Sequence, residues 1–289
     1  MRMKIRTREA LQGLAFISPW LIGFLIFTLV PLVRTFWLSL NEVRVTAGGI
    51  RTFFVELRNY KDAFLTDVTF SGMLIDYALQ MAVYIPVIIS FSMAVALLLN
   101  LKIKGQGLFR TIFFLPVIIS SGPVLAELAD KGAMTFEGLT NLGFLVNLQT
   151  TLPPSIARLL AFAVGSFIVI LWFSGVQILI YLASLQKIDR SMYEAARIDG
   201  ASGWQILWKL TIPSLIPITF INIVYTIVTV STFSTSAVIQ KIQTDMYRPE
   251  KGLGYASALS WIYFLVMLAI IGLFVLINVI YRKKGGERS

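Results

Sequence analysis

Polar stretches divide the chain into six long runs of apolar residues. The runs cover residues 14–40, 72–101, 108–128, 157–185, 212–234 and 256–281. Each run supplies the roughly 20 residues that a helix needs to cross the hydrocarbon core of a bilayer. The pattern therefore predicts an all-α membrane protein with six transmembrane helices, in which residues 1–289 form a single transmembrane domain.

The first run follows a basic lead that contains Arg2, Lys4, Arg6 and Arg8. A basic lead before an apolar core is also the pattern of a secretory signal peptide. This core is too long for a signal peptide, and no small-residue cleavage site closes it. We therefore expect an uncleaved spanning helix.

The composition excludes a water-soluble fold. Of the 289 residues 57% are hydrophobic and 14% are charged, with a mean hydropathy of +0.78, whereas a soluble domain carries about a quarter charged residues. Cysteine and histidine are absent, so the usual nucleophile, general base and zinc ligands are missing. We expect no metal site and no enzyme activity, although paired carboxylates leave a membrane-embedded enzyme open as an alternative.

The net charge of +10 is distributed in a way that argues against nucleic acid. The basic residues flank the apolar runs and do not cluster with aromatic residues on one face. With odd-numbered spans running outward, fifteen Lys and Arg lie inside and nine outside, and Arg34 at a helix end completes the 25. The positive-inside rule then predicts that both termini are cytoplasmic.

The polar stretch 186–213, between the fourth and fifth predicted spans, carries helix signals of its own. Ser191 with Glu194, and Ser202 with Gln205, have the spacing of capping boxes, in which two side chains satisfy the first amides of a helix. The stretch therefore predicts two short helices that lie across the inner face of the membrane.

Gly200 and Pro213 mark the limits of these helices. Gly200 stands where the first helix must end and can take the left-handed conformation. Pro213 suits the first turn of the fifth span. Apolar surface for docking is offered by Tyr193, Ala196, Trp204, Leu207 and Trp208.

The same stretch resembles the EAA loop of binding-protein-dependent ABC transporter permeases. The matching residues are Glu194-Ala195-Ala196, Asp199-Gly200-Ala201 and Leu210-Thr211-Ile212-Pro213. The resemblance covers most of the chain and is to the carbohydrate-uptake permeases of the maltose permease type. Further matches are Ser18-Pro19-Trp20, Leu57-Arg58-Asn59-Tyr60 and Arg110-Thr111-Ile112-Phe113-Phe114-Leu115-Pro116, with Glu56 where the family usually has glycine.

The resemblance implies a type I ABC importer fold in the bacterial inner membrane, with a cytoplasmic coupling helix. A second permease subunit would complete the pathway, two cytoplasmic ATPase subunits would bind below, and an external solute-binding protein would deliver the substrate. Coupling to the ATPase would fall on Glu194, Ala195, Ala196, Asp199, Gly200 and Pro213. The chain has no GxxxxGK[ST] phosphate loop, so ATP and Mg²⁺ would be bound by the ATPase and no cofactor by this chain.

Polar side chains inside the predicted spans are candidates for the substrate pathway. They are Asp76, Gln80, Gln177, Tyr181, Asn222 and Tyr225. An acid at membrane depth usually faces a cavity or a partner, and amide, hydroxyl and aromatic groups suit a sugar. The alternatives are an Asp76 at the membrane interface and polar contacts that hold neighbouring helices together.

The substrate class that the resemblance implies is an oligosaccharide or a related sugar. A polyol or a sugar phosphate is the alternative within transport, but a phosphate would require basic residues inside the spans, and only Arg34 comes near. A membrane enzyme would need acids that converge at one depth. A structural anchor would leave the EAA resemblance without an explanation.

Overall fold

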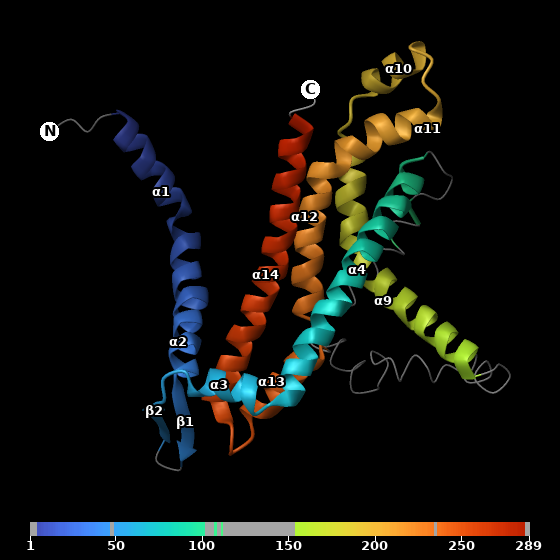
Figure 1. The fold of residues 1–289 in the computed structure, drawn as a ribbon. Coiled ribbons are helices and arrows are strands. Elements are labelled where there is room, and N and C mark those ends of the chain that lie inside the picture. Colours follow the sequence, from blue (N-terminus) through green and yellow to red (C-terminus); the bar gives the residue numbers. More distant parts are fainter. Residues whose placement is uncertain are drawn as a thin grey trace. The chain divides into compact units, whose positions relative to one another are not determined.

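The computed structural model describes residues 5–46, 49–101, 107–108, 111, 154–233 and 236–286 (Figure 1). Among these, the stretches long and apolar enough to cross a membrane are Gln12–Ser39, Val68–Asn100, Gly203–Ser231 and Gly252–Ile277. A fifth is added if Ile170–Leu185 forms one span with the helix after it. The predicted helical membrane fold is confirmed. The predicted span 108–128 lies outside the described residues except at positions 108 and 111, so the count of six stays a prediction.

The chain packs as two compact units. The first contains Met1–Leu74 and Val238–Leu265, and the second contains Ile75–Ala237 and Val266–Ser289. Two long helices, α4 (Val68–Asn100) and α14 (Gly252–Gly286), begin in the first unit and continue into the second.

The first unit opens with two apolar helices, continues through a hairpin and short helices, and ends with the start of a long apolar helix. Helices α1 (Ile5–Phe24) and α2 (Val30–Ser39) are joined by a π-helical turn, Leu25–Leu29. After α2 come β1 (Asn41–Thr46), β2 (Gly49–Phe54), α3 (Arg58–Leu65) and the start of α4, and the unit is completed by α13 (Ala237–Met246) and the start of α14.

Strands β1 and β2 form an antiparallel hairpin, which is an addition to the predicted all-helical fold. Asn41 pairs with Phe54 and Thr46 pairs with Gly49. The hydropathy pattern places this segment in a polar loop outside the membrane, but its β-branched and aromatic residues favour an extended backbone. The hairpin connects two helices and leaves the helical class unchanged.

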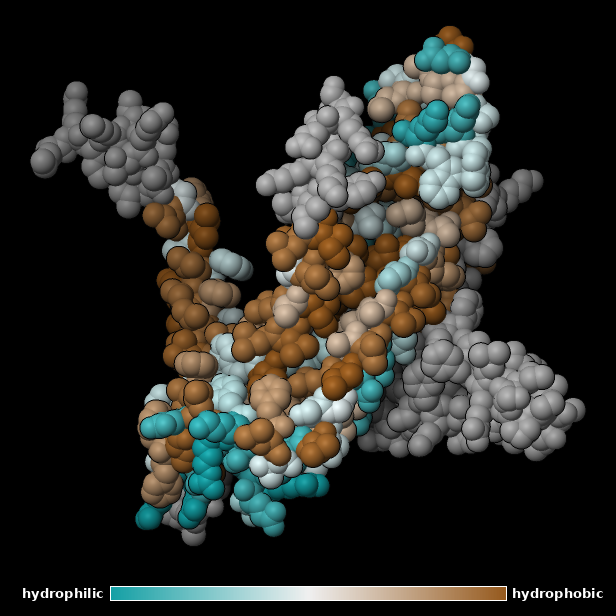
Figure 2. All heavy atoms as spheres, viewed as in Figure 1, coloured by the Kyte–Doolittle hydropathy of each residue, from teal (hydrophilic) through white to brown (hydrophobic). Residues whose placement is uncertain are grey.

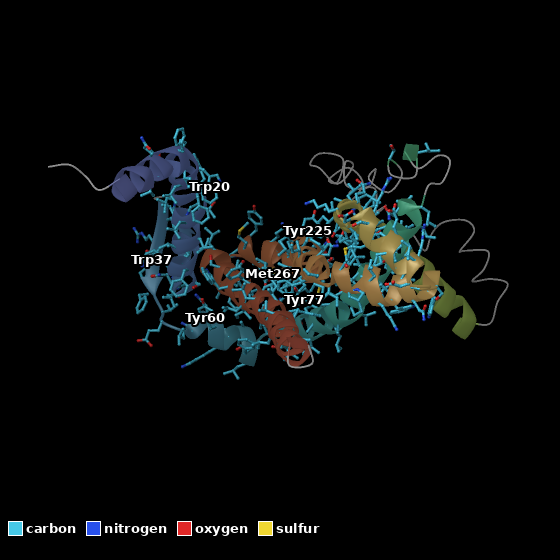
Figure 3. All side chains as sticks on the ribbon, turned by 90° about the horizontal axis from the view of Figure 1, so that it is seen from above. Trp20, Trp37, Tyr60, Tyr77, Tyr225 and Met267 are labelled. Atoms are coloured by element: carbon cyan, nitrogen blue, oxygen red, sulfur yellow. The ribbon has the colours of Figure 1, made fainter. Side chains whose placement is uncertain are left out.

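Close backbone contacts hold the end of α2. Gly254 is the third residue of α14, and a Cβ atom there would overlap the carbonyl oxygen of Asn41, so only glycine fits at this position. The Asn59 side chain donates to the carbonyl oxygens of Ser39 (2.8 Å) and Asn41 (3.1 Å). The hydroxyl of Tyr60, labelled in Figure 3, lies 2.7 Å from that of Ser39. Helices α3 and α14 are thereby fixed to the end of α2.

Glu56 has a left-handed backbone, with φ of 54°. This is the position at which the permease family usually has glycine. A side chain with a Cβ is strained in this conformation and glycine is not. Glu56 therefore holds a strained backbone conformation that glycine would adopt without strain.

The second unit packs α9 (Pro154–Leu185) against α12 (Ile212–Ser231). Phe173 meets Phe233 edge to face, with ring centroids 5.0 Å apart, and Ile178 and Ile227 are fully buried. Between α9 and α12 the chain forms α10 (Arg190–Ile198) and α11 (Gly203–Ile206). The apolar contacts place the core of this unit along the α9–α12 pair.

Large apolar side chains remain exposed along the long helices. Trp20 on α1 is 68% exposed and Leu79 on α4 is 61% exposed, and Figure 2 shows hydrophobic surface along the coloured part of α1. Soluble proteins rarely expose continuous apolar surface of this extent. The surface fits contact with lipid.

Each π-helical turn ends two residues before a proline. Leu25–Leu29 precedes Pro31, and Leu207–Thr211 precedes Pro213. In both turns the amide before the proline donates to the carbonyl five positions earlier instead of four. A proline ring clashes with the carbonyl four residues before it, and the wider turn relieves that clash without ending the helix.

Candidate functional site

Helix α10 begins at an aspartate cap. The Asp189 carboxylate accepts a hydrogen bond from the Ser191 amide at 3.0 Å. This bond, and a second one from the Ser191 side chain, lower the pKa of Asp189. The predicted capping box of Ser191 with Glu194 is wrong, because Asp189, two residues earlier, already provides the cap.

The end of α10 confirms the conformation predicted for Gly200. Its φ is +78°, its amide donates to the carbonyl of Arg197 at 3.1 Å, and the Ala201 amide donates to the carbonyl of Ala196 at 2.9 Å. These two bonds and the left-handed residue form a Schellman motif. The turn from α10 to α11 therefore depends on glycine at this position.

The second predicted capping box is confirmed at the start of α11. The Ser202 amide donates to Oε1 of Gln205 at 2.8 Å, and the Gln205 amide donates to Oγ of Ser202 at 3.3 Å. Helix α11 does not stop, however, and continues through the π-helical turn into α12. The stretch Gly203–Ser231, called the rod below, is one helix. Pro213 lies in the first turn of α12, as predicted.

The predicted coupling residues on α10 and after it lie on an exposed segment. Helix α10 is bent by 65° from Ile170–Leu185 of α9, and Figure 1 shows α10 and α11 beyond the ends of α9 and α12. Ala196 is half-buried, and the exposed residues are Glu194, Ala195, Asp199 and Gly200. This arrangement leaves a small helix exposed beyond the ends of α9 and α12.

A hydroxyl pair links α10 to the rod. The Tyr193 hydroxyl lies 3.3 Å from Oγ1 of Thr211, which is nearly buried and also donates to the carbonyl of Ile206 at 3.3 Å. Helix α10 is therefore connected to the rod in two ways, through this contact and through the glycine turn.

Three of the predicted pathway residues lie in the interface between α9 and α12. The side chains of Gln177, Tyr181 and Asn222 are fully buried. Gln177 Nε2 donates to Oγ1 of Thr226 at 2.9 Å, and the Tyr181 hydroxyl donates to Oγ1 of Thr219 at 3.0 Å. Asn222 Nδ2 donates to the carbonyl of Gln177 at 3.4 Å. These bonds hold the two helices together.

The other three pathway candidates are exposed. Asp76 and Gln80 lie one turn apart on the exposed face of α4. Their neighbour Tyr77 points inward instead, with its hydroxyl 2.5 Å from Oγ of Ser231. Tyr225 on α12 is 36% exposed (Figure 3). The structure thus brings half of the candidates together and leaves the other half on the surface of the second unit.

An ion cluster in the first unit was not predicted from the sequence. Its members are Asp67, Lys241, Asp245, Arg248 and Lys251. Lys241 Nζ lies 2.9 Å from Asp67 Oδ2 and 3.1 Å from Asp245 Oδ2. Lys251 Nζ lies 2.7 Å and 3.2 Å from the same two oxygens. The cluster joins α13 and the start of α14 to the corner between α3 and α4.

The ion pairs of this cluster shift the pKa values of Asp67 and Lys241 away from neutrality. Burial alone would raise the pKa of Asp67, but hydrogen bonds from Lys251, Lys241 and the Phe70 amide hold it well below its usual value. Burial alone would lower the pKa of Lys241, but its bonds to Asp67 and Asp245 raise it. Neither pKa moves toward neutrality, so the cluster is a structural connection and does not resemble a proton-transfer site.

The described residues hold no group of three or more Asp or Glu side chains close enough to bind a metal ion. The feature that stands out in the second unit is α10, an exposed helix that is capped at both ends and joined to a membrane-length rod.

Comparison with known proteins gives the family. Residues 69–283 match the family described as binding-protein-dependent transport system inner membrane component. The chain is 32% identical to the probable ABC transporter permease protein YesP of Bacillus subtilis (strain 168), over 93% of this chain and 90% of that protein. It is 31% identical to the lactose transport system permease protein LacF of Rhizobium radiobacter, over 80% of this chain and 77% of LacF.

A solved structure shares the fold. It is a bacterial alginate ABC transporter in complex with an alginate pentasaccharide-bound periplasmic protein, with a TM-score of 0.52, 19% identity and 93% of each chain covered. The present chain belongs to the family of binding-protein-dependent transport system inner membrane components, and it is an ABC transporter permease.

Proposed function

We propose that this chain forms, together with a second permease subunit, the pathway of an ATP-driven importer for an oligosaccharide or a related sugar. The observation that carries the proposal is the exposed α10, which is capped at Asp189, turned at Gly200 and continuous with the rod. The lactose permease LacF, at 31% identity, supports a sugar as the substrate class.

In this proposal α10 docks on a cytoplasmic ATPase. Glu194, Ala195, Asp199 and Gly200 form the docking surface, and the half-buried Ala196 allows close approach. ATP and Mg²⁺ are bound by two ATPase subunits, and this chain contributes no cofactor. ATPase closure then moves α10, and the Tyr193–Thr211 contact passes the motion to the rod.

The proposed orientation puts α10 and both termini in the cytoplasm and the β1–β2 hairpin outside, where the solute-binding protein docks. The family description supports dependence on such a protein. The chain has no native cysteine, so Asp199→Cys and Arg51→Cys each introduce a single thiol at an exposed position. An impermeant maleimide added to intact spheroplasts should label Arg51→Cys at once and Asp199→Cys only after lysis. The reverse order would refute the orientation.

The pathway surface is proposed to carry Asp76, Gln80 and Tyr225, which are exposed on the second unit. Gln177, Tyr181 and Asn222 contribute from the buried side by fixing how α12 sits on α9. Uptake of labelled sugar should fall in Tyr225→Ala and be largely kept in Tyr225→Phe, because a sugar packs on the ring. Equal uptake by both variants and the parent would remove Tyr225 from the pathway.

The central test compares Glu194→Ala and Gly200→Pro with the exposed control Glu250→Ala, which lies in the loop after α13. The complex is purified through this chain, and both the amount of co-purified ATPase and the solute-stimulated hydrolysis are measured. The two α10 variants should lose ATPase association or stimulated hydrolysis while inserting normally, and the control should match the parent. Unchanged assembly and hydrolysis in all variants would overturn the coupling role.

A further inference from the structure

The exposed residues of helix α3 are apolar or basic, and its one acid, Asp62, has a partly exposed side chain that pairs with Arg58. Its exposed positions, together with the residue before it, are Leu57, Arg58, Lys61, Phe64 and Leu65. The apolar ones are 57%, 54% and 79% exposed, respectively. Asn59 and Ala63, one turn apart on the opposite side, are buried. The helix thus has one face packed on the first unit and one face, apolar and basic, that the unit leaves open.

Both ends of α3 are attached to the ends of candidate membrane spans. Near its start, Asn59 and Tyr60 bond to Ser39, the last residue of α2. Near its end, only two residues separate Leu65 from Val68, where α4 begins. The ends of two consecutive spans lie at the same membrane boundary, and Figure 1 shows α3 crossing between them. At about 1.5 Å per residue the helix is about 12 Å long. Because it connects two span ends at one boundary, we infer that it lies along the membrane surface.

The ion cluster fixes the corner at which α3 meets α4. Asp67 accepts a hydrogen bond from the Phe70 amide at 3.1 Å and is held by Lys241 and Lys251. The next residue, Val68, is 78% exposed and is the first residue of a candidate span. An exposed apolar residue therefore stands on each side of this corner, Leu65 at the end of α3 and Val68 at the start of α4.

We propose that α3, with Leu57 and Val68, is a lipid anchor. Phe64 and Leu65 insert at the boundary between headgroups and acyl chains, and Arg58 and Lys61 contact lipid phosphates. Exposed apolar and basic residues are the composition of helices that lie in a membrane interface, and long basic side chains can rest on apolar surface while their charges reach the headgroups. The acid of this helix, Asp62, lies one turn after Arg58 with 46% of its side chain exposed, and it pairs with that residue at 3.8 Å. The anchor sets the depth of two span ends and goes beyond the proposed transport function.

The test uses single spin labels in a chain that has no native cysteine. Leu65→Cys is compared with Tyr247→Cys, a loop position of matched exposure (79% and 81%), and with Leu79→Cys inside α4. Each full-length variant is reconstituted in phosphatidylcholine vesicles with and without phosphatidylglycerol. Collision rates with oxygen, which partitions into lipid, and with a water-soluble nickel chelate are then measured.

The oxygen-to-nickel ratio at Leu65 should be several-fold higher than at Tyr247 and lower than at Leu79. Adding Lys61→Glu should lower the ratio at Leu65, and lower it more where phosphatidylglycerol is present. A ratio at Leu65 equal to that at Tyr247 would place α3 in water and overturn the proposal. Low collision rates with both reagents would assign the face to a protein partner and overturn it as well.

Discussion

Replacing Asp245 by asparagine removes one of the two carboxylates that neutralise Lys241 and Lys251. Asp245 is 1% exposed, and its Oδ2 lies 3.1 Å and 3.2 Å from the two ammonium nitrogens. Removing one partner of a buried ion pair costs about 3–5 kcal/mol, because the remaining charge stays desolvated. Lys251 is 28% exposed and Asp67 remains as a partner, so we expect the lower end, about 3 kcal/mol, for release of α13.

Local opening of α13 can be measured with one buried thiol. Val238, in the first turn of α13, is 2% exposed, and Val238→Cys reacts with a maleimide only when the helix opens. A loss of about 3 kcal/mol corresponds to an increase of about 140-fold in the opening constant and in the labelling rate. The matched control is Asp62→Asn, which breaks the exposed pair with Arg58 and should change the rate less than about fivefold. A rate for Asp245→Asn within threefold of the parent would refute the role given to the cluster.

The pH dependence of this opening follows from the shifted pKa values. Asp67 titrates below its ordinary value of 3.8, so its contribution to stability is complete above that value and is lost only as the pH falls through the lower, folded pKa. Lys241 titrates above its ordinary value of 10.5, so its contribution is complete below that value and is lost as the pH rises through the folded pKa. The labelling rate, after correction for the deprotonated fraction of the reacting thiol, should therefore be constant from about pH 5 to about pH 9.

Three further substitutions test other parts of the fold. Gly200→Ala places a Cβ on a left-handed residue, at a cost of about 1–2 kcal/mol, and should reduce solute-stimulated hydrolysis while insertion measured by membrane fractionation is unchanged. Gly254→Ala places a Cβ against the carbonyl oxygen of Asn41, and these backbone atoms cannot move apart at low cost. We expect that no folded protein is recovered in size-exclusion chromatography. The control Gly272→Ala, which has open space around it, should be recovered normally. Gln177→Leu should lower stability in a thermal unfolding assay by less than about 1 kcal/mol, because polar contacts between membrane helices contribute about 0.6 kcal/mol each; a complete loss of uptake with unchanged stability would make Gln177 a substrate contact.

The local features of the site were predictable because neighbours in sequence produce them. The Ser202–Gln205 capping box and the left-handed Gly200 depend on residues within three or four positions, and both are confirmed. The start of α10 was misplaced for the same kind of reason, since Asp189 and Ser191 are both good caps and the pattern does not rank them. The continuity of the rod was also missed, because a proline usually begins a helix and here a π-helical turn carries the helix past it.

Tertiary features were beyond the sequence pattern. Lys251 donates a hydrogen bond to Asp67, 184 positions earlier in the sequence. In the sequence alone, each residue has the pattern of a solvated charge in a loop. The sequence also does not indicate which face of each span contacts lipid and which contacts protein. Both environments favour apolar residues, so the hydropathy of a span shows no clear helical periodicity. Only the structure shows that Gln177 is buried while Gln80 is exposed.

The π-helical turn Leu207–Thr211 has a consequence for how the length of the rod can change. Such a turn is equivalent to one residue inserted into an α-helix. The helical segments before and after it therefore face the directions that they would have in a regular α-helix without the extra residue. Loss of one residue within the turn would leave α11 facing nearly the same direction around α12. Loss of one residue elsewhere in Gly203–Ser231 would rotate α10 and α11 by about 100° about the helix axis. The turn is thus the place where this helix can gain or lose a residue without rotating the proposed docking surface on α10.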